Sequence, residues 1–305
     1  MSAVYEGVVQ IFRSVLLHPI LFRGLRRFMQ TRIFRFMERI FRKNIQNSEI
    51  HDLQLKLVSL TRELYGIGEI SFTSAEYIGA PDGNSWIPKE GRGWQALIEC
   101  FADDPESFVR ISREISQGYQ IVLSRYSLEC PDFSHDISAE GRQWVFGSLL
   151  KWSGPIVERG LLEYRDIVKV ARDFERAMNE SGYGFFEFAH GNVIGDHVYL
   201  SANKLPHLFG LRIVVRPGRG CYDFLRALDW LILKTDNEIA DFHRIVSWMK
   251  QYLDLERFDW EEVKLVFALR CIGILGWDML HRGDMGAGDT KRKIEILLRF
   301  IRRDY

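Results

Sequence analysis

Side chains that can transfer protons or bind metal ions gather in one short stretch of the chain. This stretch, FAHGNVIGDHVYL at residues 188–200, contains His190, His197 and the carboxylate of Asp196. Imidazole and carboxylate groups act as general acids and bases, and both also bind metal ions. The Gly-Asn pair that ends at Asn192 is typical of a turn. The stretch therefore predicts a polar turn that carries the chemistry of the protein.

The residues on either side predict the elements that position this turn. Residues 142–180 have helical spacing before it, and the β-branched and aromatic residues VYL end it as a short strand. The apolar run Leu211 to Val215 follows as a second strand, and YDFLRALDWLI then begins a helix with Asp223 in its first turn. The predicted order is helix, turn, strand, strand and helix.

This order resembles the larger lobe of the aminoglycoside phosphotransferase and protein-kinase-like superfamily, over residues 164–234. Aligned on the His-Gly pair, the catalytic aspartate of that family falls on Asn192 and its metal-binding asparagine on His197. The aspartate that ends the next strand in the family falls on Gly210. Asp223 matches the aspartate that opens the following helix and holds the catalytic loop in shape.

The resemblance implies ATP and Mg²⁺ as cofactors, with changed chemistry at the metal. Phosphoryl transfer depends mainly on positioning and charge neutralisation, so Asn192 in place of an aspartate slows the reaction by about 10²- to 10⁴-fold without changing the site's shape. Magnesium prefers hard oxygen ligands over an imidazole such as His197, and Gly210 supplies no ligand. Asp196 or Asp223 could supply the carboxylate that is missing at Gly210.

In the same interpretation His190 and Asn192 orient the acceptor, and Asp196 or His197 helps to bind the metal. Each of these residues also has a simpler interpretation. His190 fits a buried loop histidine bonded to backbone carbonyls, Asn192 a turn residue, and His197 a strand residue that faces a polar cleft.

Upstream, residues 65–91 predict a strand, a turn at Pro81-Asp82-Gly83-Asn84 and a second strand. Gly66 and Gly68 are then placed to approach nucleotide phosphates, and Lys89 on the returning strand is the matching cation. A bulge or tight turn is the alternative for the two glycines.

The rest of the chain is predicted to be mainly helical. Residues 94–127 return to helical spacing, with a helix boundary at Asp104-Pro105. The chain after Asp223 is helical almost to its end.

The first 43 residues are strongly basic, with nine Arg or Lys residues against two glutamates, although the whole chain has a net charge of zero. Their spacing predicts an amphipathic helix broken near Pro19, without the eighteen consecutive apolar residues of a membrane span. Such a helix suits an anionic membrane surface. Packing on the protein itself or on a protein partner is the alternative, and nucleic acid is disfavoured because no aromatic platform accompanies the arginines.

The chain has 305 residues and four cysteines, none of them in a CxxC pair. This spacing predicts neither a zinc site nor a disulfide framework, and it favours a reducing, cytoplasmic location. No cleavable signal sequence is recognised, so we expect a cytoplasmic protein at the inner face of a membrane. The predicted fold is α+β, mainly helical and bilobal. Residues 1–48 form the basic arm, residues 49–127 a small strand-containing lobe, and residues 128–305 a helical large lobe.

The expected function is a kinase-like phosphotransferase that acts on a sugar, a lipid-linked saccharide or another small hydroxylated acceptor. Two alternatives agree with the same residues. One is a catalytically impaired pseudokinase that serves as a binding or regulatory module, and the other is an unrelated helical protein that docks on a membrane or partner.

Overall fold

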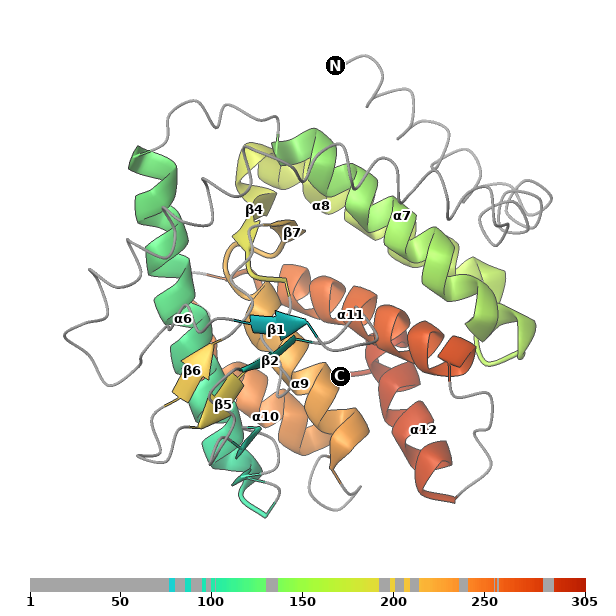
Figure 1. Cartoon of the computed structure of the whole chain (residues 1–305). Helices are drawn as coiled ribbons and strands as arrows, with labels where there is room; N and C mark the ends of the chain where they lie inside the picture. Colours follow the sequence, from blue (N-terminus) through green and yellow to red (C-terminus); the bar gives the residue numbers. More distant parts are fainter. Residues whose placement is uncertain are drawn as a thin grey trace.

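The computed structural model describes residues 77–79, 86–88, 95–96, 100–101, 103–129, 137–191, 198–200, 206–208, 214–235, 241–254, 256, 258–281 and 288–305. The predicted arm at residues 1–48 lies outside them. Figure 1 shows the elements, which are, in chain order, β1 (Tyr77–Gly79), β2 (Trp86–Pro88), β3 (Gln95–Ala96), α6 (Pro105–Glu129), α7 (Ile137–Glu158), α8 (Tyr164–Ser181), a 3₁₀ turn η1 (Gly182–Phe185), β4 (Phe186–Ala189), β5 (Val198–Leu200), β6 (Pro206–Leu208), β7 (Val214–Pro217), α9 (Tyr222–Lys234), α10 (Phe242–Tyr252), α11 (Trp260–His281) and α12 (Gly288–Arg302). The described part is mainly helical with short strands, which confirms the prediction of a mainly helical α+β protein.

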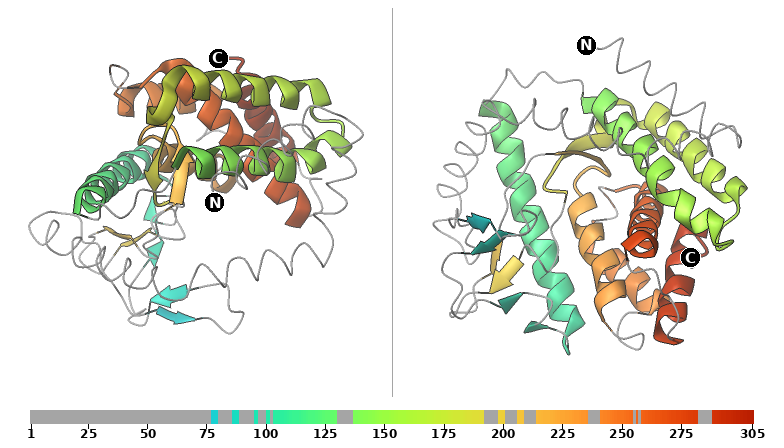
Figure 2. Two further views of the ribbon diagram at one scale, coloured as in Figure 1. Left: turned by 90° about the horizontal axis from the view of Figure 1, so that it is seen from above. Right: turned by 45° about the vertical axis from the view of Figure 1, so that its right-hand side comes forward.

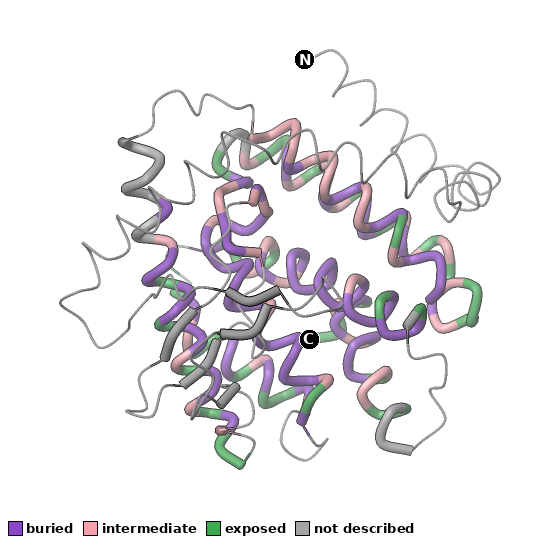
Figure 3. Tube along the Cα trace, in the orientation of Figure 1, coloured by how far each residue is buried: buried purple, intermediate pink, exposed green. Residues whose placement is uncertain are grey.

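Helix α11 lies at the centre of the core. Residues 265–272 are buried without interruption, and a helix that is apolar on all sides must be covered by other elements. Its neighbours are α7, α12, α9 and α8. Figure 3 shows the buried residues concentrated along α11 and α9. Where α11 crosses α7, a Cβ built on Gly276 would lie 2.2 Å from the backbone oxygen of Trp152, so this crossing requires a glycine.

Helix α6 begins where the sequence predicts, at Pro105, directly after Asp104. The Asp104 carboxylate accepts a hydrogen bond from the amide of Ser107 at 3.2 Å, a common way to satisfy the first amides of a helix. Helix α6 packs against β4, α9 and α10. The predicted lobe boundary at residue 127 falls inside α6, in a helix that packs on elements of the predicted large lobe.

The short strands form three small antiparallel sheets. The predicted hairpin is confirmed, because β1 pairs with β2 through Tyr77↔Pro88, Ile78↔Ile87 and Gly79↔Trp86. The prediction of helical spacing from residue 94 was wrong at its start, since β3 pairs there with β5. Pairing with a distant strand decides the conformation of such a short segment over its local pattern. Figures 1 and 2 place β5 and β6 beside α6.

Strands β4 and β7 form a separate ladder inside the helical part. The strand β4, which the sequence did not predict, pairs with β7 from Phe186↔Pro217 to Ala189↔Val214. It contacts both α6 and α7. The ladder therefore joins β4, which directly precedes His190, to β7, which is followed by α9.

Candidate functional site

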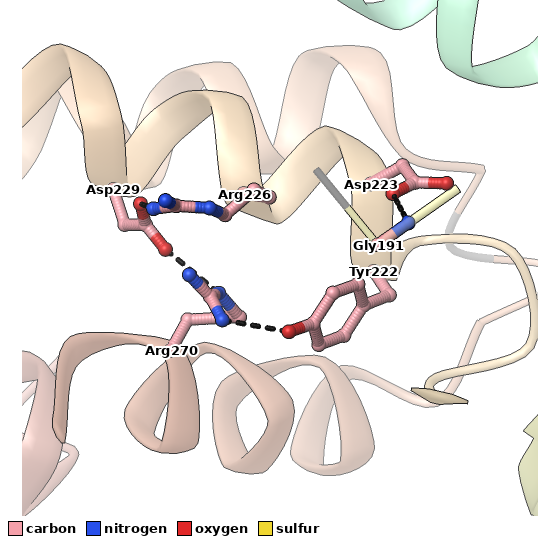
Figure 4. A network of polar contacts seen from close by, with 6 residues as sticks. All are labelled: Gly191, Tyr222, Asp223, Arg226, Asp229 and Arg270. Atoms are coloured by element: carbon pink, nitrogen blue, oxygen red, sulfur yellow. Dashed lines mark hydrogen bonds and ion pairs between the residues drawn. The ribbon is translucent and has the colours of Figure 1, made fainter. Parts of the chain in front are cut away.

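The polar turn begins directly after β4, and a carboxylate from α9 holds its first two residues. The amide of His190 donates a hydrogen bond to Oδ2 of Asp223 at 2.8 Å, and the amide of Gly191 donates to Oδ1 at 2.7 Å. Asp223 is 0% exposed and lies in the first turn of α9. Hydrogen bonds to an ionised carboxylate are about twice as strong as neutral ones, and the helix dipole favours a negative charge at this end. Asp223 therefore fixes the backbone of the turn (Figure 4).

The side chain of His190 lies inside the core. It is 0% exposed, and its ring meets Tyr119 of α6 edge to face, with the ring centroids 5.3 Å apart. On the same helix, Gln120 donates a hydrogen bond to the backbone oxygen of Phe188 at 3.1 Å. The imidazole thus joins the turn to α6. This position agrees with the simpler interpretation of His190 as a buried loop histidine.

Gly191 adopts a conformation that few other residues tolerate. Its φ is +78°, in the left-handed region. A Cβ at this position would lie 2.5 Å from Cγ2 of Val214, which is the first residue of β7. Both the backbone angle and the close approach of β7 therefore require glycine after His190.

A cationic side chain covers the same glycine. A Cβ built on Gly191 would lie 3.5 Å from Nε and 3.6 Å from Nη2 of Arg216. The guanidinium carbon of Arg216 lies 4.1 Å from the ring centroid of Trp144 and 5.7 Å from that of Tyr222. Those two rings are themselves edge to face, with centroids 5.5 Å apart and an interplanar angle of 83°. We call this arrangement of Trp144, Tyr222 and Arg216 the aromatic corner.

Sequence reasoning did not identify the aromatic corner. None of its three residues was singled out as a candidate site residue. The three residues belong to α7, β7 and α9 and come together through the pairing of β4 with β7, which the sequence pattern does not specify. No local signal would have found them.

A buried polar network contacts the hydroxyl group of Tyr222 (Figure 4). Arg270 of α11 donates from Nη1 to the Tyr222 hydroxyl at 2.6 Å and from Nε to Oδ2 of Asp229 at 2.8 Å. The other oxygen of Asp229, a residue with 0% exposure, accepts from Arg226. Burial opposes the charge on Arg270, but its attraction to Asp229 and the two hydrogen bonds outweigh burial, so its pKa is raised above the ordinary value. The network ties α9 to α11.

No protein-family model, curated protein or solved structure matches this chain. The site must therefore be interpreted from its own residues. None of the helices within the described ranges is long and apolar enough to cross a membrane.

The remaining predicted site residues lie outside the described part of the chain. They are Gly66, Gly68 and Lys89 of the predicted nucleotide site, Asn192, Asp196 and His197 of the polar turn, and Gly210. The structure therefore brings together His190, Gly191 and Asp223, and it does not place the others.

Asp196 and His197, the predicted metal ligands at the turn, lie outside the described residues. Among the described residues, no three His, Cys, Asp or Glu side chains are grouped as metal ligands would be. Asp223, one of the two carboxylates considered as a replacement ligand, is enclosed in the core with both oxygens accepting backbone hydrogen bonds. Its role is structural, and we derive no chemical step through a metal ion.

Proposed function

We propose that this protein is a kinase-like phosphotransferase for a sugar, a lipid-linked saccharide or another small hydroxylated acceptor. The observation that carries the proposal is the pair of hydrogen bonds from His190 and Gly191 to the buried carboxylate of Asp223. The resemblance implies this relationship between the catalytic turn and the following helix. These bonds hold the first two residues of the predicted catalytic turn, and phosphoryl transfer depends mainly on positioning.

Nucleotide binding provides the first test. Thermal unfolding should be measured with and without ATP and Mg²⁺, with adenosine as the comparison ligand. A ligand at about 100 times its Kd stabilises the folded state by about 2.7 kcal/mol, which raises the melting temperature measurably. If ATP leaves the melting temperature unchanged at millimolar concentration, the phosphotransferase proposal fails and the unrelated helical docking protein is favoured.

Turnover provides the second test. The Asn192→Asp variant supplies the carboxylate expected at a catalytic position, and we expect it to hydrolyse or transfer the ATP γ-phosphate at least about 10²-fold faster than the wild type. Asn203→Asp is the matched control, because it adds the same charge at a position to which the resemblance assigns no role. An equal change in both variants would argue against a catalytic position for Asn192.

A catalytically impaired pseudokinase is the second candidate. It is favoured by Asn192 and Gly210, which in the alignment stand where the family has its catalytic and its metal-binding aspartate. In this case ATP raises the melting temperature, but neither the wild type nor Asn192→Asp turns it over. The protein would then act by binding.

The place of action is proposed to be the inner face of a membrane, on the basis of the basic residues in the first 43 positions. Flotation with vesicles of phosphatidylcholine alone and of phosphatidylcholine with phosphatidylserine tests this. A variant with Arg23, Arg26 and Arg27 changed to Gln should lose its preference for the anionic vesicles. Equal flotation of the wild type with both vesicles, or with neither, would contradict the proposal.

A further inference from the structure

Glu262, in the first turn of α11, contacts two chain segments that are far apart in sequence. Nε of Arg219 lies 3.1 Å from Oε2 of Glu262, and Nη2 donates a hydrogen bond to Oε1 at 3.2 Å. Oε1 also accepts a hydrogen bond from the hydroxyl group of Ser181, the last residue of α8. Only 14% of the Glu262 side chain is exposed, so solvent screens these contacts less than it screens a surface pair. One carboxylate therefore joins the end of α8 to the turn before α9.

The first segment, which begins at Ser181, leads to the polar turn. It continues through η1 and β4, and His190 follows directly after β4. The backbone oxygen of Phe185, the last residue of η1, accepts a hydrogen bond from the amide of Gly218 at 3.0 Å. Gly218 belongs to the second segment, which runs from the end of β7 to the start of α9. The two segments are thus bonded to each other as well as to Glu262.

The second segment holds an unusual backbone conformation. The φ angles of Gly218, Arg219 and Gly220 are +110°, +49° and +101°, all in the left-handed region. Such a conformation is uncommon for an arginine and persists only where its surroundings hold it. The pair with Glu262 supplies this hold, and a Cβ built on Gly218 would lie 3.3 Å from Cγ2 of Val266, about one helical turn after Glu262. Helix α11 therefore fixes the turn that leads into α9.

The two segments meet at Asp223, in the first turn of α9. Its carboxylate accepts hydrogen bonds from the amides of His190 and Gly191, which continue the first segment, whereas Asp223 itself continues the second. Hydrogen bonds weaken steeply when donor and acceptor are misaligned. The geometry of these two bonds hence depends on how the two segments are held relative to each other, and Glu262 contacts both.

We propose that Glu262 is a positioning residue for the candidate site. By binding Ser181 and Arg219 together, it keeps the carboxylate of Asp223 aligned with the two amides of the polar turn. The inference deepens the proposed function and rests on it in one respect, that phosphoryl transfer takes place at this turn and requires the alignment. The alignment itself can be measured without a nucleotide.

Hydrogen exchange of the full chain measures the alignment directly. The rate at the amide of Gly191 should be compared with that at Leu149, a buried residue of α7, so that a change in overall stability cancels in the ratio. The variant is Glu262→Gln, which keeps the shape of the side chain and removes its charge. Asp173→Asn is the matched control, because the Asp173 side chain is 15% exposed and joins α8 to Arg303, the residue that follows α12.

We expect Glu262→Gln to raise the ratio of exchange at Gly191 to exchange at Leu149 at least about tenfold, the effect of weakening one hydrogen bond to a charged group. Asp173→Asn should leave the ratio within about twofold of the wild type, even where it lowers overall stability. Arg219→Met should act like Glu262→Gln, and combining the two should add little, because both break the same pair.

The inference is overturned if Glu262→Gln leaves the exchange ratio unchanged, or if Asp173→Asn raises it equally. Circular dichroism shows whether Glu262→Gln remains folded. If it does not, Ser181→Ala takes its place, because it removes one contact of Glu262 and leaves the ion pair with Arg219. Ser181→Ala should then raise the ratio as well, and an unchanged ratio would again overturn the inference.

Turnover separates this inference from the proposed function. If the wild type transfers the γ-phosphate of ATP, Glu262→Gln should lower kcat at least about tenfold and leave KM within about twofold, because alignment matters most in the transition state. Equal kcat values would overturn the positioning role and leave the phosphotransferase standing. If the exchange ratio depends on Glu262 but neither the wild type nor Asn192→Asp turns ATP over, the alignment by Glu262 stands and the phosphotransferase falls.

Discussion

Oδ1 of Asp223 lies 2.7 Å from the amide nitrogen of Gly191, across 32 positions of sequence. The second oxygen of the same carboxylate accepts from the preceding amide in a fully buried hydrogen bond, and Asp223 itself is 0% exposed. The backbone of the turn therefore depends on one charged side chain of α9.

Replacing Asp223 with Asn should loosen the turn, because an amide offers one acceptor where the carboxylate offers two. We expect the free energy of unfolding to fall by about 2–3 kcal/mol, measured by urea denaturation. Hydrogen exchange at the amides of His190 and Gly191 should become faster. Asp241→Asn is the control, since Asp241 accepts from the amides of His243 and Arg244 at the exposed start of α10 and asparagine caps equally well. A similar loss in both variants would contradict the role assigned to Asp223.

Substituting Gly191 by Ala tests the contact between the turn and β7. Gly160 offers a matched control, because its φ of +69° is similar but a Cβ there would meet nothing within 4 Å. Gly160→Ala should cost about 1–2 kcal/mol through backbone strain alone. Gly191→Ala should cost at least about 1 kcal/mol more in urea denaturation, because its methyl group would overlap Val214.

A second substitution, Val214→Ala, separates backbone strain from steric overlap as causes of the cost of Gly191→Ala. In a Val214→Ala background, the excess cost of Gly191→Ala should shrink, since the overlapping methyl group is gone. If the two glycines respond alike, or if Val214→Ala does not reduce the excess, the predicted overlap is wrong.

Asp229 should be among the least replaceable polar residues of the core. Asp229→Leu leaves the guanidinium groups of Arg226 and Arg270 without their shared carboxylate, and breaking a buried ion pair in this way costs about 3–5 kcal/mol. A double-mutant cycle with Arg270→Met should give a coupling energy of about 1–3 kcal/mol in urea denaturation. Glu163→Gln, which removes an exposed pair with Arg165, should change stability by less than about 1 kcal/mol. Additive effects of Asp229→Leu and Arg270→Met would argue against the network.

The buried thiols predict a loss of stability at high pH. Burial raises the pKa of Cys221, with a further contribution from the charge of Glu187, and burial also raises the pKa of Cys271. A thiol in the unfolded chain has a pKa of about 8.5, so both groups favour the folded state fully below that pH and progressively less as the pH rises above it. Between pH 8.5 and 10 each thiol should lower the free energy of unfolding by up to about 1.4 kcal/mol per pH unit.

Urea denaturation of the wild type and of Cys221→Ala and Cys271→Ala across this range measures the effect. The relevant quantity is the slope with pH, because alanine also changes the packing at every pH. Each variant should show a shallower slope than the wild type. Parallel curves would mean that these thiols do not remain protonated in the folded protein.

The helices were predictable from sequence because their signals are local. The boundary at Asp104-Pro105 and the hairpin were each predicted from a few adjacent residues, and in the structure α6 begins at Pro105 and β1 pairs with β2. The two-residue strand β3 was assigned to a helix, because only its pairing with β5 makes it a strand. Short strands depend on partners that are distant in sequence.

The same difference applies to the candidate site. His190 and Asp223 could be identified from their order along the chain, but the aromatic corner could not. Arg216, Trp144 and Tyr222 meet only when α7, β7 and α9 are assembled. An arginine in a strand is ordinary in sequence, and its significance comes from the rings that surround it in three dimensions.

The pairing of Ala189 with Val214 brings the two ends of the segment between them to a single point. His190 and Gly191, directly after Ala189, are bonded to the buried Asp223, so the segment is attached to the core at its start. Lengthening such a segment costs little, since closure entropy grows only slowly with length. Insertions or deletions between Gly191 and Val214 should consequently leave the helices as they are, so that the ligand preference of this protein can change while its thermodynamic stability is kept.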